Sequence, residues 1–314
     1  MSRFKHLPLR TRVLGALSKP MDFLPKAPAG VLKAVQRAGI HPLIEKAVLG
    51  APQALPKVVQ ETVDTGAGRV DVRLYYPITD AVLPVVMFMH AGGWVIGNLA
   101  SHDAFCRRIA HATGALVIAV DYHLAPWAKF PTPVRQGEGV FAWIQREHAR
   151  LNADPERIVV MGDSAGGNLS AVLAQKFPDR LKGQILIYPV IDGAFNAPSV
   201  EENKDAPILS KKLMGWFFDC YQRTPVDRDD PEFSPIRAKD LRGLPPCLII
   251  TADYDVLRDD GFAYANALRD AGVSVRHVHY PDVHGFISFP TLCANSVEAT
   301  EEVRRFITGQ LVLQ

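Results

Sequence analysis

A serine lies between two glycines at the point where the chain changes from a strand pattern to a helix pattern, in Gly162-Asp163-Ser164-Ala165-Gly166. Residues 158–161 before it are apolar and mostly β-branched, and residues 168–176 after it keep apolar side chains on one helical face. A Gly-x-Ser-x-Gly turn between a strand and a helix presents the serine hydroxyl as a nucleophile. Ser164 is therefore the candidate nucleophile. The alternative is a glycine-rich turn in which Ser164 only caps the helix.

Consecutive glycines follow an earlier predicted strand. Residues 85–89 are apolar, and His90-Ala91-Gly92-Gly93-Trp94 comes directly after them. Glycines at the end of a strand leave backbone N–H groups free to point at a ligand oxygen. Acyl transfer needs such donors because its tetrahedral intermediate carries a negative oxygen. We expect an oxyanion hole formed by the N–H groups of Gly92, Gly93 and Ala165.

The general base must come from ten histidines. His277 and His279 alternate with other residues inside a predicted strand, which favours a structural role. Most of the others precede Ser164 and have no matching acid nearby. His284 follows the last strand pattern, in Pro281-Asp282-Val283-His284-Gly285-Phe286. A base in that loop can reach Ser164, so we expect His284 to activate it.

The acid that orients the imidazole is less sharply defined. Its candidates are Asp253, Asp255, Asp259, Asp260 and Asp282. Asp259 and Asp260 have the position of first-turn helix residues, where the helix dipole favours acidic side chains. Asp253 and Asp255 both follow the predicted strand at 247–251. Chemistry alone leaves these two open.

The elements that must position these residues alternate along the chain, which predicts an α/β fold with a mainly parallel sheet covered by helices on both faces. Buried strands are expected at 85–89, 115–120, 158–161, 184–188 and 247–251, and helices at 102–113, 132–149, 165–177, 259–271 and 296–310. A hairpin of 58–63 with 70–76 is expected before them, and an edge strand at 273–280.

Two segments interrupt this alternation. Residues 1–50 are helical in pattern, with Val31, Leu32, Val35, Ile44 and Val48 spaced for one buried stripe. Residues 193–240 contain no strand pattern but do contain a helical run around Trp216, Phe217 and Tyr221. This run is either an extra helix on the core or a cap over the site. We predict a catalytic domain at 51–314 with an insertion at about 193–240, preceded by the helical segment 1–50.

Composition limits the function classes. The chain has 314 residues, 48% hydrophobic and 22% charged, with a net charge of +2, which gives no argument for nucleic acid binding. Its N-terminal apolar run is too short for a signal peptide, and no run is long enough for a membrane span, so we expect a cytoplasmic protein without integral membrane association. The four cysteines lack metal-ligand spacing and are expected to be buried thiols.

Together these motifs resemble the hormone-sensitive-lipase-like family of α/β-hydrolases, of the bacterial carboxylesterase and lipase type. The resemblance runs from about residue 80 to the C-terminus, and the order serine, acid, histidine agrees with it. It rests on His90 to Trp94, Asp121-Tyr122-His123-Leu124-Ala125-Pro126, the Ser164 turn, Ser234-Pro235-Ile236-Arg237, Asp255-Val256-Leu257-Arg258-Asp259 and His284-Gly285-Phe286. It implies that Asp255 is the acid. It also implies a helical cap built from 1–50 and 193–240.

Two residues depart from the family pattern. Ala91 replaces the first glycine of the usual His-Gly-Gly-Gly, although both expected donor glycines are present. Trp127 stands where the family usually has glutamate, after Ala125-Pro126. The first departure predicts a slightly altered entrance to the oxyanion hole. The second affects the support of a neighbouring loop.

The sequence therefore predicts a carboxylic ester hydrolase for short- to medium-chain acyl esters, which acts through Ser164, His284 and Asp255 and an acyl-enzyme. No metal or cofactor is required, and the expected partner is a small apolar ester. A homodimer is compatible with the sequence. The alternatives are an amidase or an acyltransferase on the same residues, and a non-catalytic receptor, which the complete set of catalytic residues disfavours.

Overall fold

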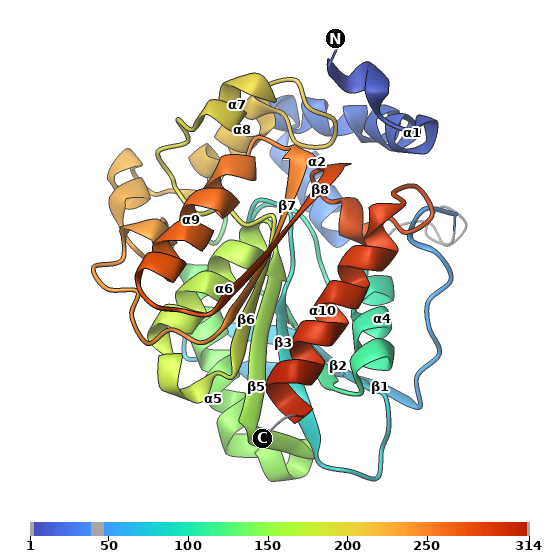
Figure 1. The fold of residues 1–314 in the computed structure, drawn as a ribbon, viewed down its shortest axis with the longest axis vertical. Coiled ribbons are helices and arrows are strands. Elements are labelled where there is room, and N and C mark those ends of the chain that lie inside the picture. Colours follow the sequence, from blue (N-terminus) through green and yellow to red (C-terminus); the bar gives the residue numbers. More distant parts are fainter. Residues whose placement is uncertain (1–2, 39–46, 313–314) are drawn as a thin grey trace.

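A twisted eight-stranded sheet forms the centre of the molecule (Figure 1). The computed structural model describes residues 3–38 and 47–312. The strand order is β1-β2-β4-β3-β5-β6-β7-β8; β1 and β2 pair antiparallel, as do β2 and β4, and all other neighbours are parallel. The strands are β1 (Lys57–Asp64), β2 (Arg69–Tyr76), β3 (Leu83–Met89), β4 (Leu116–Asp121), β5 (Ala153–Asp163), β6 (Gly183–Ile187), β7 (Cys247–Tyr254) and β8 (Val275–Val283).

Helices cover both faces of the sheet. In Figure 1, α4 and α10 lie beside each other on one face, and α5, α6 and α9 cover the other. Their bounds are α4 (Asp103–Thr113), α5 (Thr132–Leu151), α6 (Ala165–Lys176), α9 (Arg258–Asp270) and α10 (Asn295–Val312). This arrangement confirms the predicted fold class.

Helices on both faces of the sheet explain why the central strands are apolar at successive positions. Successive side chains of a strand point to opposite faces. In β3, Val86 and Phe88 accordingly join the cluster under α4 and α10, whereas Val85, Met87 and Met89 join the one under α5 and α6. All five are buried. A central parallel strand must therefore be apolar at every position rather than at alternate ones.

The remaining helices gather near the end of the sheet at which β7 and β8 terminate (Figure 1). They are η1 (Arg3–His6), α1 (Leu9–Ser18), η2 (Lys19–Lys26) and α2 (Ala29–Arg37) from the N-terminal segment, and α7 (Pro198–Glu202) and α8 (Lys211–Tyr221) from the 193–240 segment, with short 3-10 turns elsewhere. η2 packs against α8. Whether the two segments together act as a cap stays a prediction.

The predicted buried stripe of the N-terminal segment is wrong in part. Val31 and Val35 are 43% and 38% exposed, and Leu32 is the buried residue of α2. The inward face of this short helix runs through Leu32 and Gln36, four residues apart, so the two valines lie to one side of it. Val48 is half-buried, and Ile44 lies outside the described residues.

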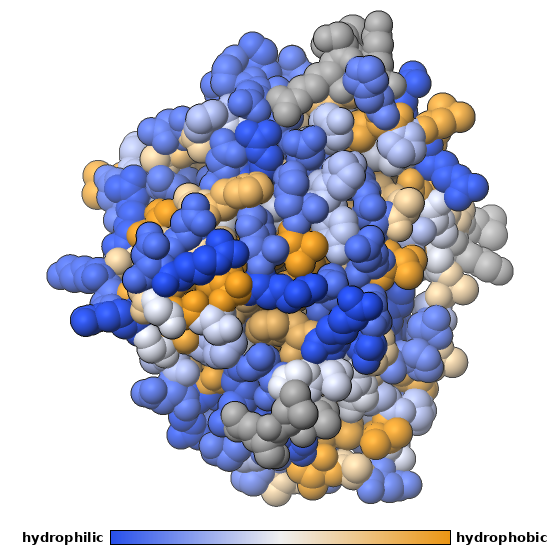
Figure 2. All heavy atoms as spheres, in the orientation of Figure 1, coloured by the Kyte–Doolittle hydropathy of each residue, from blue (hydrophilic) through white to orange (hydrophobic). Residues whose placement is uncertain are grey.

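The surface is mostly polar, with small separate apolar areas on the face shown in Figure 2. Of the four cysteines, Cys106, Cys247 and Cys293 are buried and Cys220 is half-buried, and all four are free thiols. No helix within residues 3–38 and 47–312 combines the length and apolarity needed to cross a membrane.

Candidate active site

Ser164 occupies a strained turn between β5 and α6. Its φ of 55° lies in the left-handed region, which residues with a side chain seldom adopt. Its N–H donates to the carbonyl of Ile187 at 2.8 Å. The flanking glycines are required, because a Cβ at Gly162 would lie 2.2 Å from the Gly166 oxygen and one at Gly166 would lie 2.0 Å from the Met89 oxygen. The turn therefore fits tightly against the end of β3.

His284 lies between Ser164 and Asp255. Its Nε2 is 3.0 Å from the Ser164 Oγ, and its Nδ1 is 2.7 Å from Asp255 Oδ2. The three side chains come from the ends of β8, β5 and β7, respectively, and all are buried. An Nδ1–H that donates to the carboxylate leaves Nε2 as the acceptor for the hydroxyl proton. The arrangement is that of a nucleophile, a base and an orienting acid.

The other candidate acids face different partners. Asp253 is directed toward Arg258 and His279, at 3.7 Å and 4.0 Å. Asp259 accepts hydrogen bonds from Arg258 and the Ser199 N–H, and Asp282 accepts from Asn295. Asp260 accepts from the N–H groups of the loop after β6. Only Asp255, among these five, lies against the imidazole.

The predicted oxyanion segment forms a tight turn after β3. Gly92 and Gly93 have φ values of 118° and 60°, and the Gly92 carbonyl accepts the N–H groups of Val95 and Ile96 at 3.0 and 2.9 Å. The N–H groups of Gly92, Gly93 and Ala165 form no hydrogen bond to any described residue. They are therefore available to an incoming oxygen.

Aromatic side chains of α8 cover this turn. A Cβ at Gly93 would lie 2.2 Å from the ring of Phe217, so that ring rests directly on the glycine backbone. Trp94 stacks on Tyr221 with ring centroids 4.3 Å apart and planes at 6°. Phe218 and Phe233 complete the cluster around Trp94. The position of α8 is thus coupled to the position of the turn.

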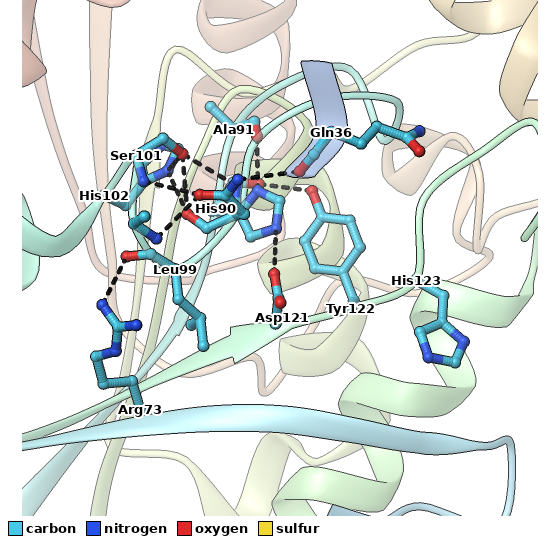
Figure 3. A network of polar contacts seen from close by, with 12 residues as sticks. Gln36, Arg73, His90, Ala91, Leu99, Ser101, His102, Asp121, Tyr122 and His123 are labelled. Atoms are coloured by element: carbon cyan, nitrogen blue, oxygen red, sulfur yellow. Dashed lines mark hydrogen bonds and ion pairs between the residues drawn. The ribbon is translucent and has the colours of Figure 1, made fainter. Parts of the chain in front are cut away.

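A polar network lies behind the turn (Figure 3). The His90 ring stacks on Tyr122 at 4.2 Å, and the Tyr122 hydroxyl donates to the His90 carbonyl at 2.7 Å. Nδ1–H of His90 donates to the Ala91 carbonyl at 2.7 Å. Burial lowers the pKa of His90 to about 3, so its ring is neutral at physiological pH. Burial raises the pKa of Asp121, 4.0 Å away, to about 6.

The two departures from the family pattern have local effects. Ala91 contributes its carbonyl to His90 and leaves the turn at Gly92 and Gly93 formed. Trp127 is 46% exposed, and the Lys33 ammonium lies 4.9 Å from the centroid of its ring. The indole therefore contacts the N-terminal segment through a cation–π interaction.

Sequence reasoning missed two residues beside the site. Tyr188, directly after β6, has a φ of 37°, and its ring centroid lies 4.6 Å from that of His284. Gln36 of α2 hydrogen-bonds to the carbonyls of Val95 and Ala125. The strand-end position of Tyr188 was a weak signal. Gln36 carried none, because its partners are 59 and 89 residues away.

Within the described ranges, no group of three or more His, Cys, Asp or Glu side chains is arranged to hold a metal ion. The convergence of Ser164, His284 and Asp255 opposite three free N–H groups is suited to attack on a carbonyl carbon and stabilisation of the resulting oxyanion.

Known proteins resemble this chain in sequence and in structure. A family model described as alpha/beta hydrolase fold matches residues 86–288. A carboxylesterase of Mycobacterium tuberculosis, NlhH, is 40% identical over 264 residues, which cover 79% of this chain and 82% of that protein. An ethyl acetate hydrolase of Pseudomonas putida is 35% identical over a match that covers 72% of this chain and 74% of that protein. The structure of a hyperthermophilic esterase from the archaeon Pyrobaculum calidifontis superposes with a TM-score of 0.88 at 35% identity. The superposition covers 96% of this chain and 98% of that one.

Proposed function

Because the chain belongs to the hormone-sensitive-lipase-like family of α/β-hydrolases, we propose that Ser164, His284 and Asp255 hydrolyse carboxylic esters through an acyl-enzyme. The chain is an ester hydrolase of the carboxylesterase class. The observation that supports these residue roles is the position of His284, within hydrogen-bond distance of both Ser164 and Asp255 in a buried site.

Acylation begins when Ser164 Oγ attacks the ester carbonyl carbon and its proton passes to His284 Nε2. Asp255 Oδ2 accepts the hydrogen bond from Nδ1–H and stabilises the imidazolium that forms. The carbonyl oxygen becomes negative and is bound by the N–H groups of Gly92, Gly93 and Ala165. His284 then gives its proton to the departing alkoxide, which leaves as the alcohol.

Deacylation repeats these steps with water as the nucleophile. His284 Nε2 removes a proton from the water as its oxygen attacks the acyl carbon. The second oxyanion occupies the same hole, and the proton on His284 returns to Ser164 Oγ as the carboxylic acid is released. The cycle uses no group beyond the side chains and N–H donors already named.

We further propose a preference for uncharged acyl groups of short to medium length. The Phe217 ring against Gly93 supports this preference, because it places an apolar wall next to the carbonyl position and limits the space there. Ethyl acetate hydrolase of Pseudomonas putida is a relative named for a short ester. The cytoplasmic location, and a homodimeric state with which the sequence is compatible, stay predictions that fractionation and light scattering would test.

Turnover of a matched ester and anilide tests the reaction class. We expect p-nitrophenyl butyrate to be hydrolysed with a kcat/KM at least a hundredfold above that of the corresponding p-nitroanilide. A preference for the anilide would indicate an amidase. Transfer of the butyryl group to added alcohol in place of water, at low alcohol concentration, would indicate an acyltransferase.

A further inference from the structure

One side chain of the N-terminal segment, that of Gln36, is hydrogen-bonded to the turn after β3 that carries two of the proposed oxyanion donors. This turn, Gly92 to Ile96, is called the oxyanion turn below. Nε2 of Gln36 donates to the carbonyl of Val95 at 2.7 Å and to that of Ala125 at 3.0 Å, so both hydrogens of one amide group are used. The backbone around Gln36 is held in return, because Asn98 Nδ2 donates to the carbonyls of Gln36 and Ala38 at 3.0 and 3.1 Å. Gln36 lies beside the His90 network in Figure 3.

Two hydrogen bonds connect Gln36 to the proposed donors. Val95, whose carbonyl Gln36 holds, donates its N–H to the Gly92 carbonyl. The peptide group between Gly92 and Gly93 is planar and trans, so the Gly93 N–H points opposite to the Gly92 carbonyl. The Gly92 carbonyl also accepts the N–H of Ile96, which belongs to the same peptide group as the Val95 carbonyl. The position of the Val95–Ile96 segment therefore sets the direction of the Gly93 N–H. Ala125, whose carbonyl Gln36 also holds, donates its N–H to the Trp94 carbonyl at 2.8 Å. This bond fixes the peptide group between Trp94 and Val95, which contains the Val95 N–H.

No other described residue replaces these bonds. Gln36 supplies the only hydrogen bonds that the carbonyls of Val95 and Ala125 accept within residues 3–38 and 47–312. Val95 and Ala125 are themselves fully buried. A buried carbonyl that loses its donor is unfavourable, so without Gln36 the turn would shift to find another one.

We propose that Gln36 is a positioning residue for the oxyanion hole, which makes helix α2 part of the catalytic machinery. This inference rests on the ester hydrolysis proposed above. The oxyanion exists only in the transition state and intermediate, so misplaced N–H donors lower kcat and leave the binding of the uncharged ester nearly unchanged. A purely structural role for Gln36 would instead lower the fraction of active enzyme and the melting temperature.

Gln36→Met tests this directly, because methionine keeps the length and much of the packing of the side chain and removes its donors. We expect kcat per titrated site to fall at least about tenfold, consistent with the cost of a misplaced donor, while KM stays within twofold. The inhibition constant of a trifluoromethyl ketone should rise in proportion, because its adduct with Ser164 carries an oxyanion. Gln36→Glu keeps the side-chain size but also removes the amide donors, so its kcat per titrated site should fall at least as far.

Gln145→Met is the matched control, since Gln145 also donates its amide to a backbone carbonyl, that of Pro155, near the start of β5 and away from the site. Its kcat per titrated site should equal that of the wild type. An unchanged kcat in both Gln36 variants, or a loss of activity explained wholly by the active fraction, would overturn the inference. Wild-type protein that hydrolyses no ester would instead contradict the proposed function.

Discussion

Asp255 and Asp253 lie two residues apart but contact different groups. Asp255 is fully buried, and its two carboxylate oxygens accept from His284 Nδ1–H and from the Leu257 N–H at 2.7 and 2.9 Å. The side chain of Asp253 is 36% exposed and is directed toward Arg258 and His279. The Asp255 carboxylate can therefore fix the imidazole orientation. Both ring nitrogens of His284 are already engaged, Nδ1 by Asp255 and Nε2 by Ser164.

Asp255→Asn should lower kcat by about 10⁴, because an amide no longer stabilises the imidazolium and can hold the wrong tautomer. Asp253→Asn, the matched control, should retain activity within a fewfold of the wild type. Steady-state kinetics on one ester for both variants gives the comparison. If Asp253→Asn is the more damaging substitution, the assignment of the acid is incorrect.

At the residue scale, the sequence could single out Ser164, His284 and the glycines Gly92 and Gly93 as candidates because each stands in a local motif at a strand end. It could not separate Asp253 from Asp255 by chemistry, since the choice depends on where each carboxylate points at the end of β7; the family resemblance favoured Asp255. Gln36 could not be found, because its hydrogen bonds connect segments far apart in the chain.

Helix α8 provides the wall of the site nearest the oxyanion turn. Phe217 rests on Gly93, and Tyr221 stacks on Trp94, so the helix contacts two successive residues of that turn. A smaller side chain at Phe217 would leave space beside the position expected for the acyl group. Accommodating one more methylene contributes ~0.8 kcal/mol, or about fourfold in kcat/KM.

Phe217→Leu should therefore shift the preference toward longer acyl chains, raising the ratio of kcat/KM for octanoate over butyrate esters by about fourfold or more. Phe141→Leu is the control, because Phe141 is buried on α5 against Phe177 and away from the site. Kinetics on a series of p-nitrophenyl esters gives the ratio. The same ratio in Phe217→Leu and the wild type would mean that α8 does not limit the acyl pocket.

At the element scale, the strands and their covering helices followed from apolar runs and helical spacing. The stripe at Val31 and Val35 was predicted incorrectly because a nine-residue helix carries several apolar residues, and only its docking partner decides which face turns inward. In α2 the inward face carries Gln36, which is hydrogen-bonded to the carbonyls of Val95 and Ala125. Sequence periodicity does not contain this information.

A buried acid of α9 links the stability of the whole molecule to pH. Asp260 accepts the N–H groups of Ile191 and Asp192, at 2.8 and 3.0 Å. Burial, with a contribution from the nearby carboxylates of Asp192 and Asp255, raises the pKa of Asp260 to about 7. The unfolded chain loses this proton near pH 4, so the native state binds more protons between about pH 4 and 7. Stability from this residue therefore decreases as pH rises through that window.

Asp260→Asn keeps a hydrogen-bond acceptor and cannot ionise, so the variant should gain stability relative to the wild type as pH increases. The gain between pH 5 and pH 8 should be on the order of 3 kcal/mol, since one pKa unit corresponds to about 1.4 kcal/mol. Urea denaturation at the two pH values measures it. Asp270→Asn, at the exposed end of the same helix, should show a constant difference from the wild type. If the free energy of unfolding of Asp260→Asn differed from that of the wild type by the same amount at pH 5 and pH 8, the prediction would be refuted.

For the whole molecule, the α/β class and the parallel sheet were predictable because doubly covered strands must be apolar throughout. The placement of the N-terminal segment and of α7 and α8 near the ends of the strands was expected only from the family resemblance, because it depends on contacts between segments distant in the chain, such as that of Trp94 with Tyr221. Those contacts surround the site and are where its selectivity is expected to arise.

The central claim is that Ser164 is the nucleophile of an ester hydrolase, and labelling by an organophosphonate tests it most directly. Mass spectrometry of the treated protein should show one phosphonyl group, located on Ser164 after proteolysis, with loss of ester turnover in proportion to labelling. Ser164→Ala should be neither labelled nor active, and it should melt at nearly the wild-type temperature. Labelling on another residue, or ester turnover that persists in Ser164→Ala, would contradict the account.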